Sequence, residues 1–161
     1  MIPGALITAD AAALLTRLQD THGPVMFHQS GGCCDGSSPM CYPLGDFLVG
    51  DRDVLLALLD VPGPQGDDGV PVWISGPQYE TWKHTQLIID VVPGRGGGFS
   101  LEAPEGMRFL SRGRVYTDEE KAQLQAAKVI TGADYERGER PSVRGHVVTG
   151  DAPEMCPIPE A

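Results

Sequence analysis

Apolar residues in this chain come in short runs separated by Gly- and Pro-rich turns, a pattern that predicts many short strands. The most strand-like run is 86–92, whose continuous apolar character indicates burial on both faces. The run 53–59 is also apolar, but its periodicity does not decide between strand and helix. Further strands are predicted at 25–27, 46–49, 71–75, 99–102, 107–110 and 114–116.

Polar capping patterns predict two longer helices, one near each end of the chain. Thr8 to Asp10 can cap a helix that runs to about Gln19, and Gly23-Pro24 ends it. Thr117 to Glu120 forms a capping-box pattern for a helix that continues to about Val129. A shorter helical segment begins at Gly76-Pro77.

The distribution of these elements predicts one domain of α+β class. Residues 1–130 carry the regular pattern, interrupted by the Pro/Gly/Asp-rich surface loop 60–70. Residues 131–161 have only isolated apolar positions, which is typical of an extended or partly disordered tail. We therefore expect a small β-rich body with an N-terminal helix, a C-terminal helix and a tail.

The amino-acid composition limits the classes of partner that the protein could bind. The net charge of −10 argues against nucleic acid, which requires clustered Lys and Arg. The sequence contains neither an apolar run long enough to span a bilayer nor a secretory signal pattern, so we expect a cytoplasmic protein without membrane contact. Four cysteines in a reducing compartment are more often metal ligands or reactive thiols than structural disulfides.

Three of these cysteines lie in the stretch 28–41, which reads HQSGGCCDGSSPMC and follows a predicted strand. Its glycines and its Asp-Gly and Ser-Pro turns allow the backbone to fold back on itself. That geometry would bring its histidine and cysteines close together. Thiolate and imidazole are good ligands for zinc or iron, so the candidate metal ligands are His28, Cys33, Cys34, Cys41 and His84.

These candidates are not equivalent. Cys33 and Cys34 are adjacent and would point in opposite directions in an extended chain, so one of them is expected to bind a metal with Cys41 while the other packs inward. His28 or His84 would complete the set, although His84 is equally well explained as a structural histidine. Cys156, beside prolines in the tail, is expected to be a free thiol.

The chain resembles the family of bacterial proteins catalogued as domain of unknown function 779. The matching stretches are HGPVMFHQSGGCCDGSSPMCYP, VPVWISGPQYETWKHTQLIIDVVPGRGGGFSLEAPEG and RFLSRGRVYTDEE. Genes of that family often lie beside an aldehyde dehydrogenase gene, so the resemblance implies an accessory role in aldehyde or alcohol metabolism, with that enzyme as a partner.

A second similarity is to the HesB-like A-type iron–sulfur carriers, in which a Gly-Gly-Cys-Ser-Gly loop follows a helix and a strand. The counterpart here is Gly31 to Gly36, and the similarity implies a HesB-like body with Cys33 as the ligand that matches the carriers' cysteine. The carriers' terminal Cys-Gly-Cys pair is missing, since Met107-Arg108-Phe109 stands near that point. A single iron or zinc ion is therefore expected rather than an iron–sulfur cluster.

Three functions remain open at this stage. The leading hypothesis is a metal-binding accessory protein, either monomeric or a homodimer. A thiol redox enzyme or sensor could use the same cysteines, with His28 or His84 as the base. A non-catalytic interaction module is the third alternative, in which the cysteine loop only contacts a partner.

Overall fold

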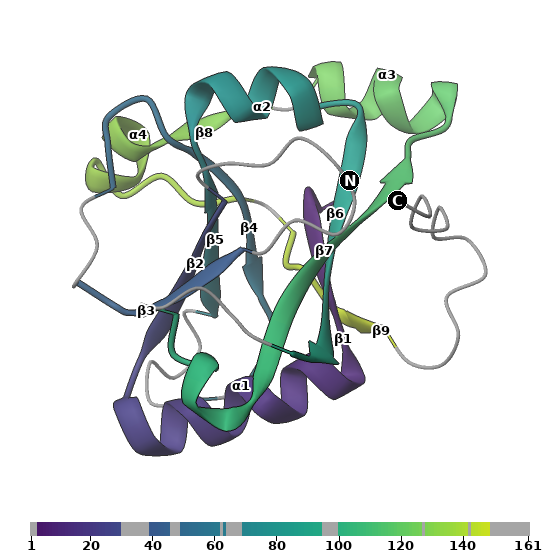
Figure 1. Cartoon of the computed structure of the whole chain (residues 1–161). Helices are drawn as coiled ribbons and strands as arrows, with labels where there is room; N and C mark the ends of the chain where they lie inside the picture. Colours follow the sequence, from purple (N-terminus) through teal and green to yellow (C-terminus); the bar gives the residue numbers. More distant parts are fainter. Residues whose placement is uncertain are drawn as a thin grey trace.

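The computed structural model confirms the α+β class, with two β-sheets and four α-helices among the residues that it describes. These are residues 3–29, 39–45, 49–61, 63, 69–94, 100–126, 128–141 and 143–148. The two sheets lie side by side in Figure 1, with one helix below them and two helices above. The hydrophobic core lies between the sheets.

The first sheet, sheet A, has the strand order β7-β6-β1-β9. β6 (Thr85–Pro93) and β7 (Met107–Val115) form a long antiparallel pair, while β1 (Ala5–Thr8) runs parallel to β6 and to β9 (Val147–Val148). Burial of Gln86 to Ile89 explains the continuous apolar run in the sequence. β1 itself was not predicted, because its four residues lead directly into a helix.

The second sheet, sheet B, has the order β3-β2-β5-β4-β8. Its strands are β2 (Val25–Gln29), β3 (Met40–Pro43), β4 (Val54–Leu59), β5 (Val70–Ile74) and β8 (Ile130–Thr131). The undecided run at 53–59 is therefore a strand. β4 pairs with β5, which lies between β2 and β4 and has all five residues buried. Pairing with this buried strand favours a strand over a helix for the run 53–59.

Two short backbone contacts join the sheets where β1 passes β4. The amide of Gly4 donates to the carbonyl of Leu56 over 3.1 Å, and Gly145 pairs with Leu59. A Cβ on Gly145 would lie 2.2 Å from the carbonyl oxygen of Ala5, so only glycine fits this close approach. Backbone contacts as well as a common core thus join sheet A to sheet B.

Helix α1 (Ala9–His22) closes the lower end of the core (Figure 1). The Thr8 hydroxyl accepts a hydrogen bond from the amide of Ala11 and caps the helix, as the sequence predicted. The helix extends three residues beyond the predicted end. It stops at Gly23, whose φ of +82° favours glycine and whose amide donates to the carbonyl of Gln19.

The remaining helices lie at the other end of the sheets and along sheet B. α2 (Gly76–Trp82) and α3 (Asp118–Ala126) lie above the sheets in Figure 1, and α4 (Gly132–Glu136) lies close to β4. No helix among the described residues is both long and apolar enough to cross a membrane.

Several predictions differ from the structure. The helix predicted to about Val129 ends at Ala126, and the strands predicted at 107–110 and 114–116 form the single strand β7. The strand predicted at 99–102 is absent from its described part, residues 100–102, which form a bend and a turn before the short 3-10 helix η2 (Ala103–Glu105). The side chains of Ser100 and Glu102 bind backbone amides there, which replaces strand pairing. The stretch 131–148, predicted as part of an extended tail, instead contributes α4, β9 and part of β8. Residues 149–161 and the predicted strand residues 46–48 lie outside the described part.

Candidate functional site

Cys41 lies on the inner face of sheet B, in the middle of strand β3. It pairs with Phe27 across the antiparallel ladder, so both side chains project from the same face into the core. Phe27 in turn contacts Phe109 edge to face, with 4.9 Å between the ring centroids. The side chain of Cys41 is fully buried. Sheet B thus holds this thiol between the two sheets.

A buried carboxylate accompanies Cys41. Glu102 is also fully buried, and one carboxylate oxygen accepts a hydrogen bond from the amide of Phe109 over 3.1 Å. The other oxygen accepts the hydroxyl of Ser100, which itself accepts a hydrogen bond from the amide of Cys41 over 2.9 Å. Within the described residues, no Lys, Arg or His forms an ion pair with Glu102.

This environment controls the protonation of the thiol. Burial raises the pKa of Cys41 well above its ordinary value, and the negative charge of Glu102 raises it further. The thiol is therefore protonated at neutral pH. A cation bound between the two groups would reverse this effect, because a metal ion stabilises a coordinating thiolate and compensates the neighbouring carboxylate.

His28 lies on the opposite face of sheet B. It is adjacent to Phe27 in an extended strand, so its side chain points to the outer face, as does that of Met26, which packs against Trp73. His28 is buried, and its Nε2 lies 2.9 Å from Oδ2 of Asp53. The same oxygen accepts the amide of Gly50 over 3.0 Å. Because they face opposite sides of the sheet, His28 and Cys41 do not meet at one ion.

His84 is also remote from Cys41. His84 is exposed between α2 and β6, just before the start of β6. Cys41 lies beside Glu102, which binds the amide of Phe109. Phe109 pairs with Val91 near the other end of β6. Six strand residues separate Thr85 from Val91, which corresponds to roughly 20 Å. Lys83 and Lys121 line the same surface hollow as His84. Their positive charges disfavour a bound cation at that position.

The described residues contain no group of three or more His, Cys, Asp or Glu side chains placed to hold a metal ion. They contribute one two-residue donor pair on the inner face, Cys41 with Glu102, and one His–Asp pair on the outer face. Cys33, Cys34 and Cys156 lie outside the described residues. The metal site predicted from the sequence stays a prediction.

Sequence reasoning missed two residues, Glu102 and Asp53. Glu102 follows a glycine-rich turn and resembles an ordinary strand-end acid in the sequence, while Asp53 precedes an apolar run. Both contacts join residues far apart in the chain, 59 positions for Cys41 and Ser100 and 25 for His28 and Asp53. For Glu102, a single acid between apolar residues was the available signal, but that signal does not identify the partner.

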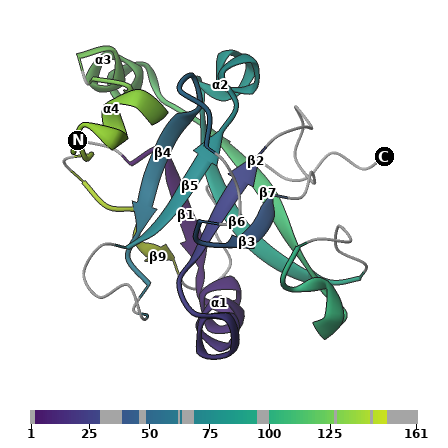
Figure 2. The same cartoon turned by 90° about the vertical axis from the view of Figure 1, so that its left-hand side faces the viewer.

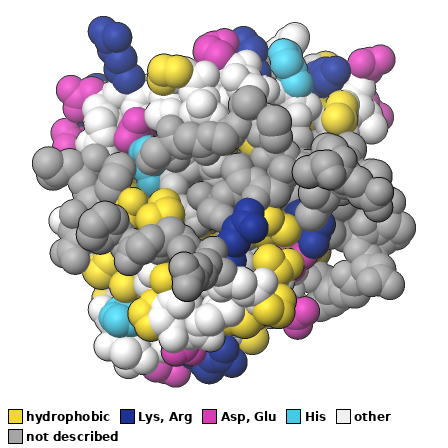
Figure 3. Space-filling model, in the orientation of Figure 1, with side chains coloured by type: hydrophobic (Ala, Val, Ile, Leu, Met, Phe, Trp, Pro, Cys, Tyr) yellow, Lys and Arg dark blue, Asp and Glu magenta, His cyan; other side chains and the backbone are white. Residues whose placement is uncertain are grey.

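The molecular surface carries both hydrophobic and charged side chains. On the face seen in Figure 3, hydrophobic side chains gather across the lower half, and charged side chains of both signs lie above and below them. Figure 2, turned by 90°, shows β2, β5 and β4 of sheet B extending between α1 and α2. The strand ends that carry His28 and Asp53 lie on the α2 side of that sheet, since β5 leads directly into α2.

Comparison with known proteins gives one match. A family model described as a domain of unknown function (DUF779) matches residues 14–115, which include β2, β3, β4, β5, β6 and β7 with all the candidate residues named above. Neither the curated proteins nor the solved structures include a match.

Proposed function

Because this chain belongs to the domain of unknown function 779 family, whose description names no activity, we propose from the site itself that it is a small metal-binding accessory protein for zinc or iron. The observation that carries the proposal is the buried pair of Cys41 and Glu102. Two groups that each carry a negative charge when ionised lie together in the core without a described cationic side chain. A divalent cation would compensate both.

The same geometry favours metal binding over thiol redox chemistry for Cys41. The thiolate is the reactive form of cysteine, and reactive cysteines lie in partly exposed, electropositive surroundings. Cys41 is fully buried beside an acid, which keeps it protonated and inaccessible. A structural or regulatory metal needs no such access to a large substrate.

The proposed ligand set differs from the one expected from the sequence. Cys41 and Glu102 would supply two ligands, with Cys33 as the third and Cys34 as its alternative. Ser100 and the amide of Phe109 would orient the Glu102 carboxylate, as outer-shell hydrogen bonds do in metal sites. His28 is assigned to the outer face, where Asp53 fixes its ring. His84 is left out of the set.

The partner forms a separate part of the proposal. The resemblance to the family implies association with an aldehyde dehydrogenase, and the net charge of −10 is compatible with a protein partner. Co-purification of the two proteins, followed by measurement of dehydrogenase activity with and without this chain, would test the association. Activity unaffected by a stoichiometric excess of the chain would argue against an accessory role.

Metal analysis of the full chain, purified without oxygen, tests the binding proposal. We expect about one zinc or iron per chain by elemental analysis. Cys41→Ser, Cys33→Ser and Glu102→Gln should each lower the metal content at least severalfold, since each removes one anionic ligand. Binding should also weaken as the pH falls toward 5, because thiolates and carboxylates must lose protons to bind.

Cys156→Ser is the matched control, since it replaces a cysteine that has no place in the proposed set. It should keep the metal content of the unchanged protein. Circular dichroism of each variant would separate loss of a ligand from loss of the fold. Full metal content in Cys41→Ser, or metal-free unchanged protein, would contradict the proposal.

A further inference from the structure

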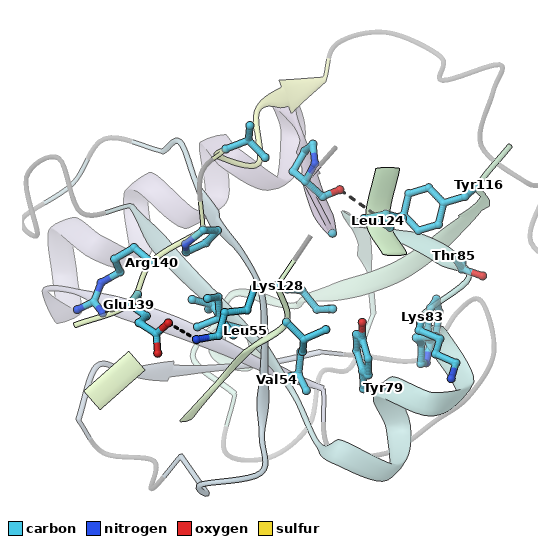
Figure 4. Close-up of a pocket in the computed structure, with 18 residues that line it drawn as sticks. Val54, Leu55, Tyr79, Lys83, Thr85, Tyr116, Leu124, Lys128, Glu139 and Arg140 are labelled. Atoms are coloured by element: carbon cyan, nitrogen blue, oxygen red, sulfur yellow. Dashed lines mark hydrogen bonds and ion pairs between the residues drawn. The ribbon is translucent and has the colours of Figure 1, made fainter. Parts of the chain in front are cut away.

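A pocket at the seam between the two sheets lies apart from Cys41, which is not among its lining residues. It has a volume of about 370 Å³, within the range of small-molecule sites. Its wall combines the stretch before β1, one side of β4, helix α2, helix α3, and residues 128–130, 139–141 and 143 (Figure 4). We call it the seam pocket. Because so many elements border it, its shape depends on the whole fold rather than on one loop.

The interior surface of the seam pocket is mainly apolar. Val54 and Leu56 of β4, Trp82 of α2 and Leu124 of α3 line it, together with Ile130. Trp82 and Ile130 are buried, so these side chains are held firmly by the core. An apolar surface of this kind favours a ligand with a hydrocarbon or aromatic body.

A phenol supplies a directed polar group. Figure 4 shows the Tyr79 side chain rising from α2 with its hydroxyl pointing into the space between the labelled side chains. Burial raises the pKa of Tyr79 above its ordinary value, so its hydroxyl stays protonated and can donate a hydrogen bond. Tyr116, on the far side, is already anchored, since its hydroxyl donates to the carbonyl of Pro3.

The side chains that line the seam pocket have a positive net charge, whereas the net charge of the whole chain is negative. The lining side chains include three cations, Lys83, Lys128 and Arg140, against one acid, Glu139, in a chain whose net charge is −10. The adjoining hollow, which shares Tyr79 and Lys83, adds the cation Lys121 and His84 and one acid, Glu80, so cations still outnumber acids. Local positive charge in an acidic protein attracts anions.

The lysines can exchange their present partners for a ligand. Lys83 pairs with Glu80, and Lys128 pairs with Glu139 and, at 3.9 Å, with Asp134, but the lysine side chains are 39% and 60% exposed. Exposed ion pairs of this kind contribute little stability, so a bound anion can compete with the two glutamates.

We propose that the seam pocket binds a small carboxylic acid with an apolar body, its carboxylate directed to Lys83 and Lys128 and its body against Val54, Leu56 and Trp82. The Tyr79 hydroxyl donates to the carboxylate from the floor of the pocket. This binding site is separate from the described part of the proposed metal site, because neither Cys41 nor Glu102 is among the residues that line it.

Isothermal titration calorimetry with three matched probes tests the proposal: 4-phenylbutyrate, 4-phenylbutan-1-ol and 4-phenylbutylamine. These share one apolar body and differ in the charge of the end group. We expect the acid to bind with a Kd on the order of 0.1–1 mM, the alcohol about tenfold more weakly, and the amine not measurably. Trp82 fluorescence should change on titration with the acid, since this residue lines the pocket.

Three variants locate the binding. Leu124→Trp fills the pocket from a half-buried position and should abolish binding of the acid. Tyr79→Phe and the double variant Lys83→Gln with Lys128→Gln should each weaken it severalfold to tenfold. Leu44→Trp, at an exposed site in the turn after β3, is the matched control and should bind the acid as the unchanged protein does.

Equal affinity for the acid, the alcohol and the amine would overturn the assignment of an anionic ligand. Binding retained in Leu124→Trp would place the site elsewhere. If none of the three probes bound, the proposal would be wrong. Metal content, measured in the same preparations, should be unchanged by the pocket variants. That comparison distinguishes failure of this inference from failure of the proposed function.

Discussion

At the scale of single residues, the buried thiol of Cys41 gives a direct test of the environment described above. Burial and the charge of Glu102 raise its pKa, so the thiolate population at pH 8 is small. We expect iodoacetamide to leave Cys41 unmodified in the folded, metal-free protein and to modify it fully in 6 M urea. Peptide mass spectrometry after timed alkylation measures both. Rapid modification in the folded protein would show that the thiol is accessible and would favour the redox alternative.

Asp90 connects sheet A to the start of helix α1. Its side chain accepts hydrogen bonds from Arg112, Thr8 and the amide of Val91, at 2.6, 2.9 and 2.8 Å. Burial opposes ionisation, but these hydrogen bonds and the charge of Arg112 outweigh it and lower the pKa of Asp90. Ionised Asp90 is therefore a stabilising group at neutral pH.

Asp90→Asn should lower the free energy of unfolding at pH 7 by about 1–3 kcal/mol, since it removes a charge-assisted contact. Because the folded-state pKa is lowered, the stabilisation is present above the unfolded value of about 3.9 and declines as the pH falls through the folded value. The variant and the unchanged protein should thus become more similar in stability as the pH falls below about 4. Urea titrations at pH 7 and in steps below pH 4 measure this. A difference that stays constant with pH would contradict the assigned role.

At the scale of secondary-structure elements, Gly145 controls how the chain before β9 approaches β1 and β4. A Cβ at this position would collide with the carbonyl of Ala5, and backbone cannot move aside as a flexible side chain can. Gly145→Ala should lower the free energy of unfolding by about 1–3 kcal/mol. Gly50→Ala is the control, because its nearest contact would be 3.7 Å, to the side chain of Asp53, and it should change stability by less than about 1 kcal/mol. Equal effects in urea titrations would argue against the close approach.

The secondary-structure elements differ in how well the sequence pattern predicts them. Long elements with strong local signals were predictable: α1 from its Thr8 cap, and β6 from an apolar run. Strands of two to four residues, such as β8 and β9, were not, because pairing with distant strands rather than local propensity stabilises them. Of the inner pair, the sequence predicted Cys41 as a site residue but not Glu102. The two residues are distant in the chain, and only the folding of β7 and η2 brings Glu102 beside Cys41.

At the scale of the whole molecule, the two tryptophans report on different regions. Trp73 packs in the cluster on the outer face of sheet B, whereas Trp82 belongs to the core between the sheets. Since the two sheets share backbone contacts and a core, we expect them to unfold together. In Trp73→Phe and in Trp82→Phe, the urea midpoint of the remaining tryptophan's fluorescence should coincide with the midpoint by circular dichroism. Separate midpoints within one variant would indicate that the sheets unfold independently.

The place of β1 has a consequence for how the protein is made. β1 leaves the ribosome before both of its neighbours in sheet A, which are Leu87 to Ile89 and then Val147-Val148. During synthesis, its apolar residues Leu6 and Ile7 must therefore wait for most of the chain before they are covered on either side. Chains with such distant pairings fold slowly, and exposed strand edges recruit other chains in the meantime. We therefore expect folding in the cell to benefit from a chaperone that shields β1 until its partner strands have been made.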